Sequence, residues 1–256
     1  SDLVNIDAIF VAAEDVLYDV RNTIKKIDLG GYTLAVKSFR KPRWPQSLIY
    51  ARWRASKAER SFKNALALLE RGIATPEPVA FIKTISRGKL NRSYYIARFH
   101  AHESSLAPLL QKAGDTSLPN SERSAACADL QAFVEFSYQM HEAGALHRDH
   151  NAGNTLVSRD GNGNGNGNGK NNCRISFAII DINRLVFRKL GLHARLNNFV
   201  RLTDNETVLR LIARHYGAVS GNNPDKCERL LFRLKRRHLQ KLALKKQLKQ
   251  LVGRGN

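Results

Sequence analysis

Three polar residues in the stretch LHRDHNAGNTLV, residues 146–157, have a spacing that suits chemistry on phosphate esters. Asp149 follows His147 by two positions and precedes Asn154 by five. An aspartate can accept or orient the proton of an attacking hydroxyl group, and an asparagine one short loop away can coordinate a magnesium ion on a nucleotide. The pattern therefore indicates phosphoryl transfer, but it is too short to decide the matter alone.

A second candidate is Asp181, which follows the apolar run of the segment IIDINR, residues 179–184. The protein-kinase fold places a metal-binding aspartate at the end of such a strand, downstream of its catalytic loop. Kinases usually continue with Phe-Gly, whereas this chain has Ile182-Asn183. Without a partner motif, an aspartate at the end of a strand would be interpreted as a turn residue. Because Asp181 follows Asn154 across a hairpin, it is predicted to be a metal ligand.

The segment LAVKSF, residues 34–39, predicts a strand with Ala35, Lys37 and Phe39 on one face. In kinases a strand lysine holds the nucleotide phosphates, and the small residue two positions earlier leaves room for adenine. Most strand lysines are solvated edge charges, so the partner of Lys37 decides between the two interpretations.

Glu59 is the expected partner of Lys37. It shares one helical stripe with three apolar residues, Phe62, Leu66 and Leu69. A carboxylate among inward-facing apolar residues is costly unless it is paired, and Lys37 can supply the opposite charge. The alternative is a surface pair between Glu59 and Lys63.

The elements that must position these residues form a β-rich half followed by a helical half. Strands are expected at residues 16–18, 23–27, 32–39, 79–83 and 93–99, with turns at 19–22 and at Gly30-Gly31. One helix is expected from about Leu48 to Arg71, ended by Gly72. The later helix Ser121–Ala143 has Ser121 as its N-cap and Gly144 after its end. Strands at 154–157 and 176–180 flank an Asn-Gly repeat, residues 161–169, which predicts a long hairpin tip.

Composition narrows the class of protein. The 256 residues are 43% apolar and 25% charged, which fits one large or two small folded domains and excludes wholesale disorder. No run approaches the roughly 18 apolar residues that a membrane span needs. Acidic residues in the first twenty positions argue against a secretion signal. Three widely spaced cysteines, Cys127, Cys173 and Cys227, predict a reducing cytosol.

The net charge is +20, from 42 Lys and Arg against 22 Asp and Glu. Such a charge attracts nucleic acid, anionic membrane or phosphate-rich small molecules. One basic stretch, RLLFRLKRRHLQKLALKKQLKQL, predicts an amphipathic helix. Its apolar residues are Leu231, Leu234 and Leu242, continued by Leu244, Leu248 and Leu251. This helix either packs on its own domain or attaches to an anionic surface.

Taken together, these segments resemble the lipopolysaccharide core kinases, the Kdo/WaaP-type sugar kinases of Gram-negative bacteria. The resemblance runs from about Val16 to Arg237 and rests on the order and spacing of five segments. They are VKSFRKP (36–42), SKAERSF (56–62), LLERGIATPEPVAFI (68–82), MHEAGALHRDHNAGNTLV (140–157) and IIDINR (179–184).

The resemblance implies an α+β, two-lobed protein-kinase-like fold, with a small β-rich N-lobe over residues 1–100 and a mainly helical C-lobe over residues 101–256. It implies transfer of the ATP γ-phosphoryl group, with Mg²⁺, to a hydroxyl of Kdo or heptose. Carried onto this chain, the catalytic base is Asp149, the metal ligands are Asn154 and Asp181, and the phosphate-positioning ion pair is Lys37 with Glu59. Ala35 lies beneath the adenine, and the hinge that bonds the base runs from Phe99 through His100 to His102.

Two kinase features are missing from the sequence. No glycine-rich G-x-G-x-x-G loop precedes Lys37, so the turn at residues 19–22 must cover the phosphates, with backbone amides or Arg21. No Ala-Pro-Glu motif follows Asp181, which argues against an ordinary protein kinase.

The expected acceptor is the lipopolysaccharide core glycolipid, and the expected location is cytoplasmic, peripheral at the inner face of the inner membrane, where anionic lipid attracts a cationic protein. Neither nucleic acid nor an obligate protein partner is expected. Two alternatives stay open: a small atypical Ser/Thr protein kinase, and a non-catalytic kinase-like domain that binds nucleic acid or anionic lipid.

Overall fold

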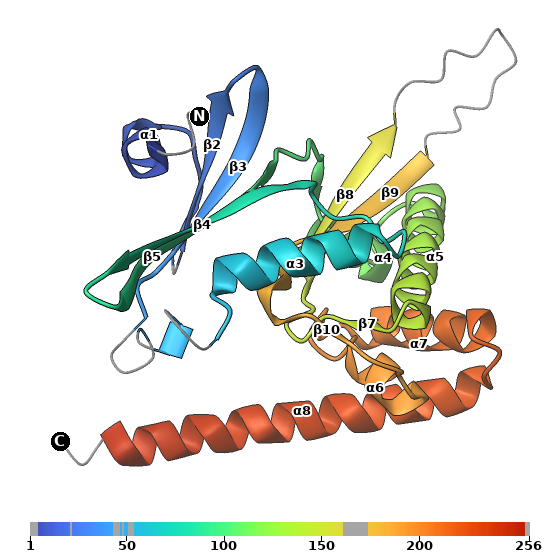
Figure 1. The fold of residues 1–256 in the computed structure, drawn as a ribbon. Coiled ribbons are helices and arrows are strands. Elements are labelled where there is room, and N and C mark those ends of the chain that lie inside the picture. Colours follow the sequence, from blue (N-terminus) through green and yellow to red (C-terminus); the bar gives the residue numbers. More distant parts are fainter. Residues whose placement is uncertain are drawn as a thin grey trace, which may run out of the picture. The chain divides into compact units, whose positions relative to one another are not determined.

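The computed structural model describes residues 5–20, 22–42, 47, 49–50, 54–160 and 174–253 (Figure 1). The chain divides into two compact units. The first unit comprises residues 1–102 and 178–185, and the second comprises residues 103–177 and 186–256. The segment that carries Asp181 therefore belongs with the N-terminal unit, and the loop that carries Asp149 belongs to the second unit.

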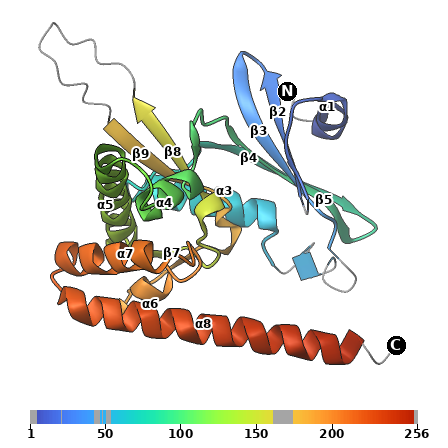
Figure 2. The same ribbon diagram turned by 180° about the vertical axis from the view of Figure 1, so that it is seen from behind.

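The first unit is built on a five-stranded antiparallel sheet with the order β1-β2-β3-β5-β4 (Figures 1 and 2). The strands are β1 (Val16–Asp19), β2 (Thr23–Leu29), β3 (Tyr32–Phe39), β4 (Pro78–Ser86) and β5 (Lys89–Arg98). All five were expected from the sequence. Gly30 and Gly31 connect β2 to β3 at φ values of +60° and +78°, which glycine adopts without a Cβ penalty.

One face of this sheet is covered by a short helix, α1 (Ile6–Ala12). Its Ile6 and Phe10 pack with Leu34 and Val36 of β3 in a buried apolar cluster. Lys25 fastens the end of the helix, because its ammonium donates a hydrogen bond of 2.7 Å to the carbonyl of Ala13. The sequence predicted a single helix in this half, so α1 is an addition.

The opposite face carries Ala35 and Lys37 and packs against α3 (Lys57–Leu69). The rings of Phe62 on α3 and Phe81 on β4 lie 5.4 Å apart. The expectation of one continuous helix from Leu48 was wrong, because residues 54–56 are not helical. Ser56 instead caps α3, where its hydroxyl accepts a hydrogen bond from the Glu59 amide at 3.1 Å.

The second unit is mainly helical. Its helices are α4 (Ala107–Gly114), α5 (Asn120–Glu142), α6 (Leu192–Asn197), α7 (Glu206–Val219) and α8 (Pro224–Gly253). A three-stranded sheet has the order β6 (Ser104–Ser105), β8 (Thr155–Asp160) and β9 (Arg174–Ile179), and β7 (Ala145–Leu146) pairs with β10 (Val186–Phe187). The core includes Phe133 of α5, Tyr216 of α7 and Leu231 of α8.

Both ends of α5 and the hairpin of β8 and β9 were expected from the sequence. Gly144 follows α5 at a φ of +73°, as predicted. The N-cap of α5 is Pro119 rather than Ser121, so Ser121 lies inside the first turn. Strands β8 and β9 are neighbours, as the hairpin prediction requires, and its Asn-Gly tip lies outside the described residues.

Helix α8 changes character along its length. Leu231 and Leu234 are buried against the second unit, whereas Leu242, Leu244 and Leu248 are exposed. The expected apolar stripe is therefore a packing face only as far as Leu234. Among the described residues, no helix combines the length and the low charge that crossing a membrane requires.

Candidate active site

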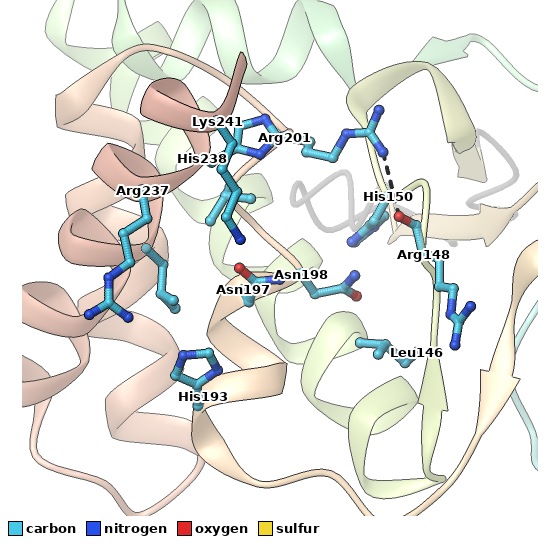
Figure 3. Close-up of a pocket in the computed structure, with 12 residues that line it drawn as sticks. Leu146, Arg148, His150, His193, Asn197, Asn198, Arg201, Arg237, His238 and Lys241 are labelled. Carbon is cyan, nitrogen blue, oxygen red and sulfur yellow. Dashed lines mark hydrogen bonds between the residues drawn. The ribbon is translucent and has the colours of Figure 1, made fainter. Parts of the chain in front are cut away.

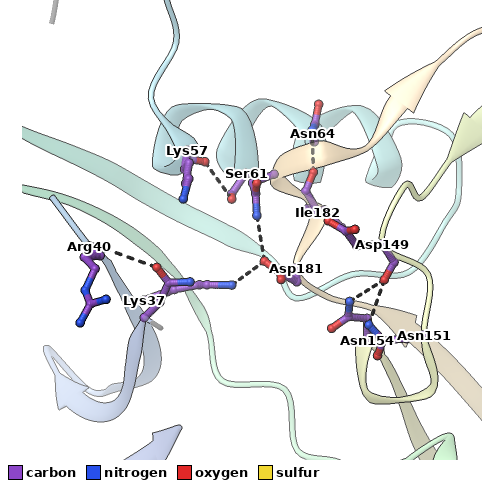
Figure 4. Close-up of polar contacts among 12 residues, drawn as sticks. Lys37, Arg40, Lys57, Ser61, Asn64, Asp149, Asn151, Asn154, Asp181 and Ile182 are labelled. Carbon is purple, nitrogen blue, oxygen red and sulfur yellow. Dashed lines mark hydrogen bonds and ion pairs between the residues drawn. The ribbon is translucent and has the colours of Figure 1, made fainter. Parts of the chain in front are cut away.

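In the first unit, Lys37 of β3 contacts Asp181. The ammonium of Lys37 lies 2.6 Å from Oδ1 of Asp181, with 14% of the lysine side chain and 36% of the aspartate side chain exposed (Figure 4). The ammonium also lies 5.3 Å from the centroid of the Phe39 ring, so Lys37 and Phe39 lie on the same face of β3, as predicted. A cation is thus held beside a carboxylate that solvent can still reach.

Asp181 has an unusual backbone. Its φ of 55° and ψ of 43° lie in the left-handed region, which is sparsely populated by residues other than glycine. The following 3₁₀ turn, η3 (Ile182–Arg184), is fastened to α3, because the Asn64 amide donates a 2.7 Å hydrogen bond to the Ile182 carbonyl. The Asn183 amide donates to Oδ1 of Asp181 at 2.9 Å. Strained backbone that several contacts maintain is typical of functional sites.

The expected ion pair between Lys37 and Glu59 is not formed. Glu59 instead binds Lys63 at 2.8 Å and Lys83 at 2.9 Å, and these two lysines lower the pKa of its carboxyl group. The alternative pair with Lys63 is therefore present. Lys83 could not be identified from local sequence, because it reaches Glu59 from β4 while Lys37 is taken up by Asp181.

Ala35 lies between Lys26 of β2 and Ala97 of β5 in the sheet register. Directly paired residues share a face, so Lys26 lies on the same face as Ala35. Its ammonium lies 5.2 Å from the centroid of the Phe99 ring. Lys26 was missed from the sequence, since only the pairing of β2 with β3 brings it beside the expected adenine position.

Some polar groups of the expected hinge residues form hydrogen bonds within the protein. The Phe99 amide donates to the Thr33 carbonyl at 2.9 Å, and Nδ1 of His102 lies 2.8 Å from the carbonyl oxygen of His100. Burial, with a smaller contribution from His102, lowers the pKa of His100. The Phe99 amide therefore serves the sheet rather than standing open to a nucleotide base.

In the second unit, Asp149 lies at the centre of the loop between β7 and β8. Oδ1 of Asp149 accepts a 2.8 Å hydrogen bond from Arg201, with 26% of the aspartate side chain exposed. The Asn154 amide donates to the Asp149 carbonyl at 2.8 Å, and the Asn151 amide donates to the same oxygen at 3.1 Å (Figure 4). The loop is thereby curled so that Asp149 and Asn154, the two residues singled out by their spacing, adjoin. Arg201 had no signal in the local sequence.

A buried network of hydrogen bonds connects this loop to the helices of the second unit. Asn198 donates a 2.7 Å hydrogen bond to the His147 carbonyl, and its amide oxygen lies 3.1 Å from Nε2 of His141. Nδ1 of His141 lies 2.9 Å from the hydroxyl of Tyr216. Burial lowers the pKa of His141 to about 4, so the ring is neutral at pH 7 and can join the network without an uncompensated charge.

Each unit contributes an oxygen donor at a position predicted to be a metal ligand. Asp181 of the first unit presents a carboxylate, and Asn154 of the second unit has an amide oxygen whose companion nitrogen is already used in a hydrogen bond. Such oxygen donors are those that Mg²⁺ prefers. No cluster of three or more His, Cys, Asp or Glu residues that could hold a metal occurs in the described part of the chain. Arg21, which was expected to help cover the phosphates, lies outside the described residues.

Comparisons with known proteins identify the family and the fold of the chain. The family model of the lipopolysaccharide kinase (Kdo/WaaP) family matches residues 38–217. The structure of WaaP in complex with acyl carrier protein is similar over 92% of this chain and 91% of that chain, with a TM-score of 0.60 and 17% sequence identity.

A second similar structure is the Rio2 kinase-ADP/Mg²⁺-phosphoaspartate complex from Chaetomium thermophilum. It covers 89% of this chain and 64% of that chain, with a TM-score of 0.49 and 17% identity. No curated protein matches the sequence. The expected α+β, protein-kinase-like fold is confirmed.

Proposed function

Because the chain belongs to the lipopolysaccharide kinase (Kdo/WaaP) family, we propose that it transfers the γ-phosphoryl group of ATP to a hydroxyl group of an inner-core sugar, Kdo or heptose. The observation that carries this proposal is the contact of 2.6 Å between Lys37 and Asp181 in the first unit. It joins a cation suited to nucleotide phosphates with a carboxylate suited to their metal ion. A helix-supported left-handed turn maintains that carboxylate in place.

Each proposed residue has a defined task. Asp149 accepts the proton of the acceptor hydroxyl as the oxygen attacks the γ-phosphorus, and Arg201 orients its carboxylate. Lys37 binds the phosphates of ATP, and Asp181 and Asn154 contribute oxygen ligands to Mg²⁺. The magnesium ion supplies positive charge that offsets the charge developing on the phosphoryl oxygens.

Ala35 and Lys26 provide the remaining support for the nucleotide. Ala35 leaves space on its face of the sheet for the adenine ring, and Lys26 adds a second cation on that face. Glu59 acts at a distance through Lys83 on β4, which keeps α3 bonded to the sheet.

The positive charge of the protein supports an anionic glycolipid as the acceptor and the surface of an anionic membrane as the location of the reaction. The chain carries +20, and α8 is mostly exposed and basic beyond Lys235. A cationic surface concentrates anionic lipids near it, with a contribution of about 1 kcal/mol per basic residue at the surface. Sedimentation with vesicles that contain anionic lipid tests this point. Binding that survives a high-salt wash would contradict the electrostatic explanation.

The direct test is transfer of radiolabel from [γ-³²P]ATP, with magnesium, to purified lipopolysaccharide that lacks core phosphate. The native protein should label the glycolipid, and Asp149→Ala should not. Asp115→Asn, a change at an exposed aspartate of the same unit, is the matched control and should keep native activity. Circular dichroism of all three proteins checks that they fold alike. Label on protein rather than glycolipid would favour the protein-kinase alternative, and no transfer to either would overturn the proposal.

A further inference from the structure

The second unit contains a cavity of about 460 Å³ that the proposed catalytic residues do not fill. Its walls come from the loop of residues 146–150, the segment around α6 and the middle of α8 (Figure 3). The basic residues that line it are Arg148, His193, Arg201, Arg237, His238 and Lys241. No acidic residue is among its lining residues. The cavity is therefore a concentration of positive charge around a solvent-accessible space.

Three of the four arginines and lysines that line the cavity are not paired with any residue that the structure describes. Within the described part of the chain, the side chains of Arg148, Arg237 and Lys241 form no hydrogen bond or ion pair. Two arginines of α7 differ in this respect, because Arg210 and Arg214 both bind Glu228, at 2.8 Å and 3.2 Å. Like charges held together without counter-charges favour the entry of an anion.

His150 adds a buried polar group to the wall of this cavity. It is 1% exposed, and neither of its ring nitrogens has a hydrogen-bond partner in the described residues. A buried polar group without a partner is costly, and such groups in native proteins usually mark a missing water, ion or ligand. The charge of the surrounding cations, rather than His150, therefore indicates an anionic occupant.

The cavity is connected to Asp149 through Arg201. Arg201 lines the cavity and also donates to the Asp149 carboxylate at 2.8 Å. The segment that carries Arg201 is held to α8, because the buried ammonium of Lys235 donates hydrogen bonds of 2.8 Å to the carbonyls of Val200 and Thr203. Lys235 is thereby used inside the protein, while Arg237 and Lys241 of the same helix face the cavity.

We propose that this cavity is an oxyanion subsite, in which Arg148, Arg237 and Lys241 bind a phosphate or carboxylate group of the acceptor and thereby orient its hydroxyl toward Asp149. This inference rests on the proposed function for the identity of the acceptor. An oxyanion suits the site, because guanidinium and ammonium groups form their strongest hydrogen bonds with phosphate and carboxylate oxygens.

The kinetic test compares two double variants that remove the same charge from the second unit. Arg237→Ala with Lys241→Ala removes two cations from the cavity wall, whereas Lys112→Ala with Lys189→Ala removes two exposed cations that neither line the cavity nor lie on α8. The cavity variant should raise KM for the lipopolysaccharide acceptor about tenfold or more, as expected for lost charge-assisted hydrogen bonds, and leave KM for ATP unchanged. The control should change both values by less than about twofold, as surface substitutions usually do. An equal rise in the two variants, or a rise in KM for ATP, would overturn the proposal.

A binding measurement keeps this inference separate from the proposed function. Calorimetric titration of the native protein, saturated with ATP, uses inorganic phosphate in one arm and free Kdo, a sugar carboxylate, in the other. At least one anion should bind, and its Kd should rise in the cavity variant but not in the control; the stronger arm identifies the group. Absence of binding by both anions would overturn the subsite. Binding that depends on the cavity, in a protein that transfers no phosphate, would keep the subsite and overturn the proposed function.

Discussion

Lys37 and Asp181 are 144 positions apart in the chain, and their side chains meet at 2.6 Å. The contact links the middle of the sheet to the turn that follows β9. Since Asn183 donates to the same carboxylate oxygen, the charge of Asp181 is shared between a cation and an amide. The two side chains are therefore expected to act together, and substitutions of both should be compared with the single substitutions.

Lys37→Met and Asp181→Asn should each reduce phosphoryl transfer by about 100-fold or more, because the first removes a cation from the phosphates and the second removes a ligand of the magnesium ion that offsets their charge. The double variant should lose little beyond the stronger single variant, as expected for residues that act together. Lys89→Met, at an exposed lysine of β5, is the matched control. Multiplication of the two single losses in the double variant would show that the residues act independently.

Glu59 should make stability depend on pH in the acid range. Lys63 and Lys83 hold its pKa below the ordinary value of 4.5, so the folded state is favoured above that pH and loses the benefit as pH falls through the lowered pKa. Glu59→Gln should cost about 0.5–1 kcal/mol at pH 7. Urea unfolding of both proteins from pH 7 to pH 3 checks this, and a stability difference that stays constant with pH would contradict it.

His141 should make the stability of the protein depend on pH in a range above that of Glu59. Its pKa of about 4 in the folded state lies below the ordinary 6.5, so the unfolded state binds the proton first and stability is lost as pH falls from 6.5 toward 4. The full loss from this group is about 3 kcal/mol. His141→Gln can keep the hydrogen bonds but does not titrate. The stability gap between native and variant proteins should narrow over this range, and parallel curves would exclude His141 as the cause.

Gly144→Ala should destabilise the protein for two reasons. The residue has a φ of +73°, and a Cβ would lie 2.9 Å from the Arg188 carbonyl oxygen. Gly221→Ala isolates the first reason, because its φ is +67° and the space around it is open. The control should cost about 1–2 kcal/mol, and Gly144→Ala should cost clearly more. Equal decreases in the free energy of unfolding of the two variants, measured by chemical denaturation, would show that the contact with Arg188 relaxes at no cost.

Local patterns were sufficient for much of the fold. The alternation in β3 identified Ala35 and Lys37 on one face and left Leu34 and Val36 for the buried face, because the strand period is strict. Gly144 was identifiable because left-handed residues after a helix are usually glycine. Helix α1 was not found, since seven residues carry too little periodicity to distinguish a helix from a strand.

Contacts between distant segments could not be read in the same way. The carboxylate expected beside Lys37 was that of Glu59, but Lys83 competes for Glu59 from β4 and Asp181 takes its place. Arg201 lies 52 positions from Asp149 and has no neighbouring motif that marks it. Which of many lysines and arginines pairs with a given acid depends on strand register and loop path, and in a chain with 42 of them composition leaves the choice open.

Helix α1 has a practical consequence for handling the protein. Its Ile6 and Phe10 shield Ile27, Leu34 and Val36 from water, while the residues proposed to hold the nucleotide project from the other side of the same strands. A shortened chain that begins after Ala12 would keep every proposed catalytic side chain and still expose an apolar sheet surface, which favours aggregation. Loss of yield on trimming this end would then report on colloidal stability, and would carry no information about catalysis.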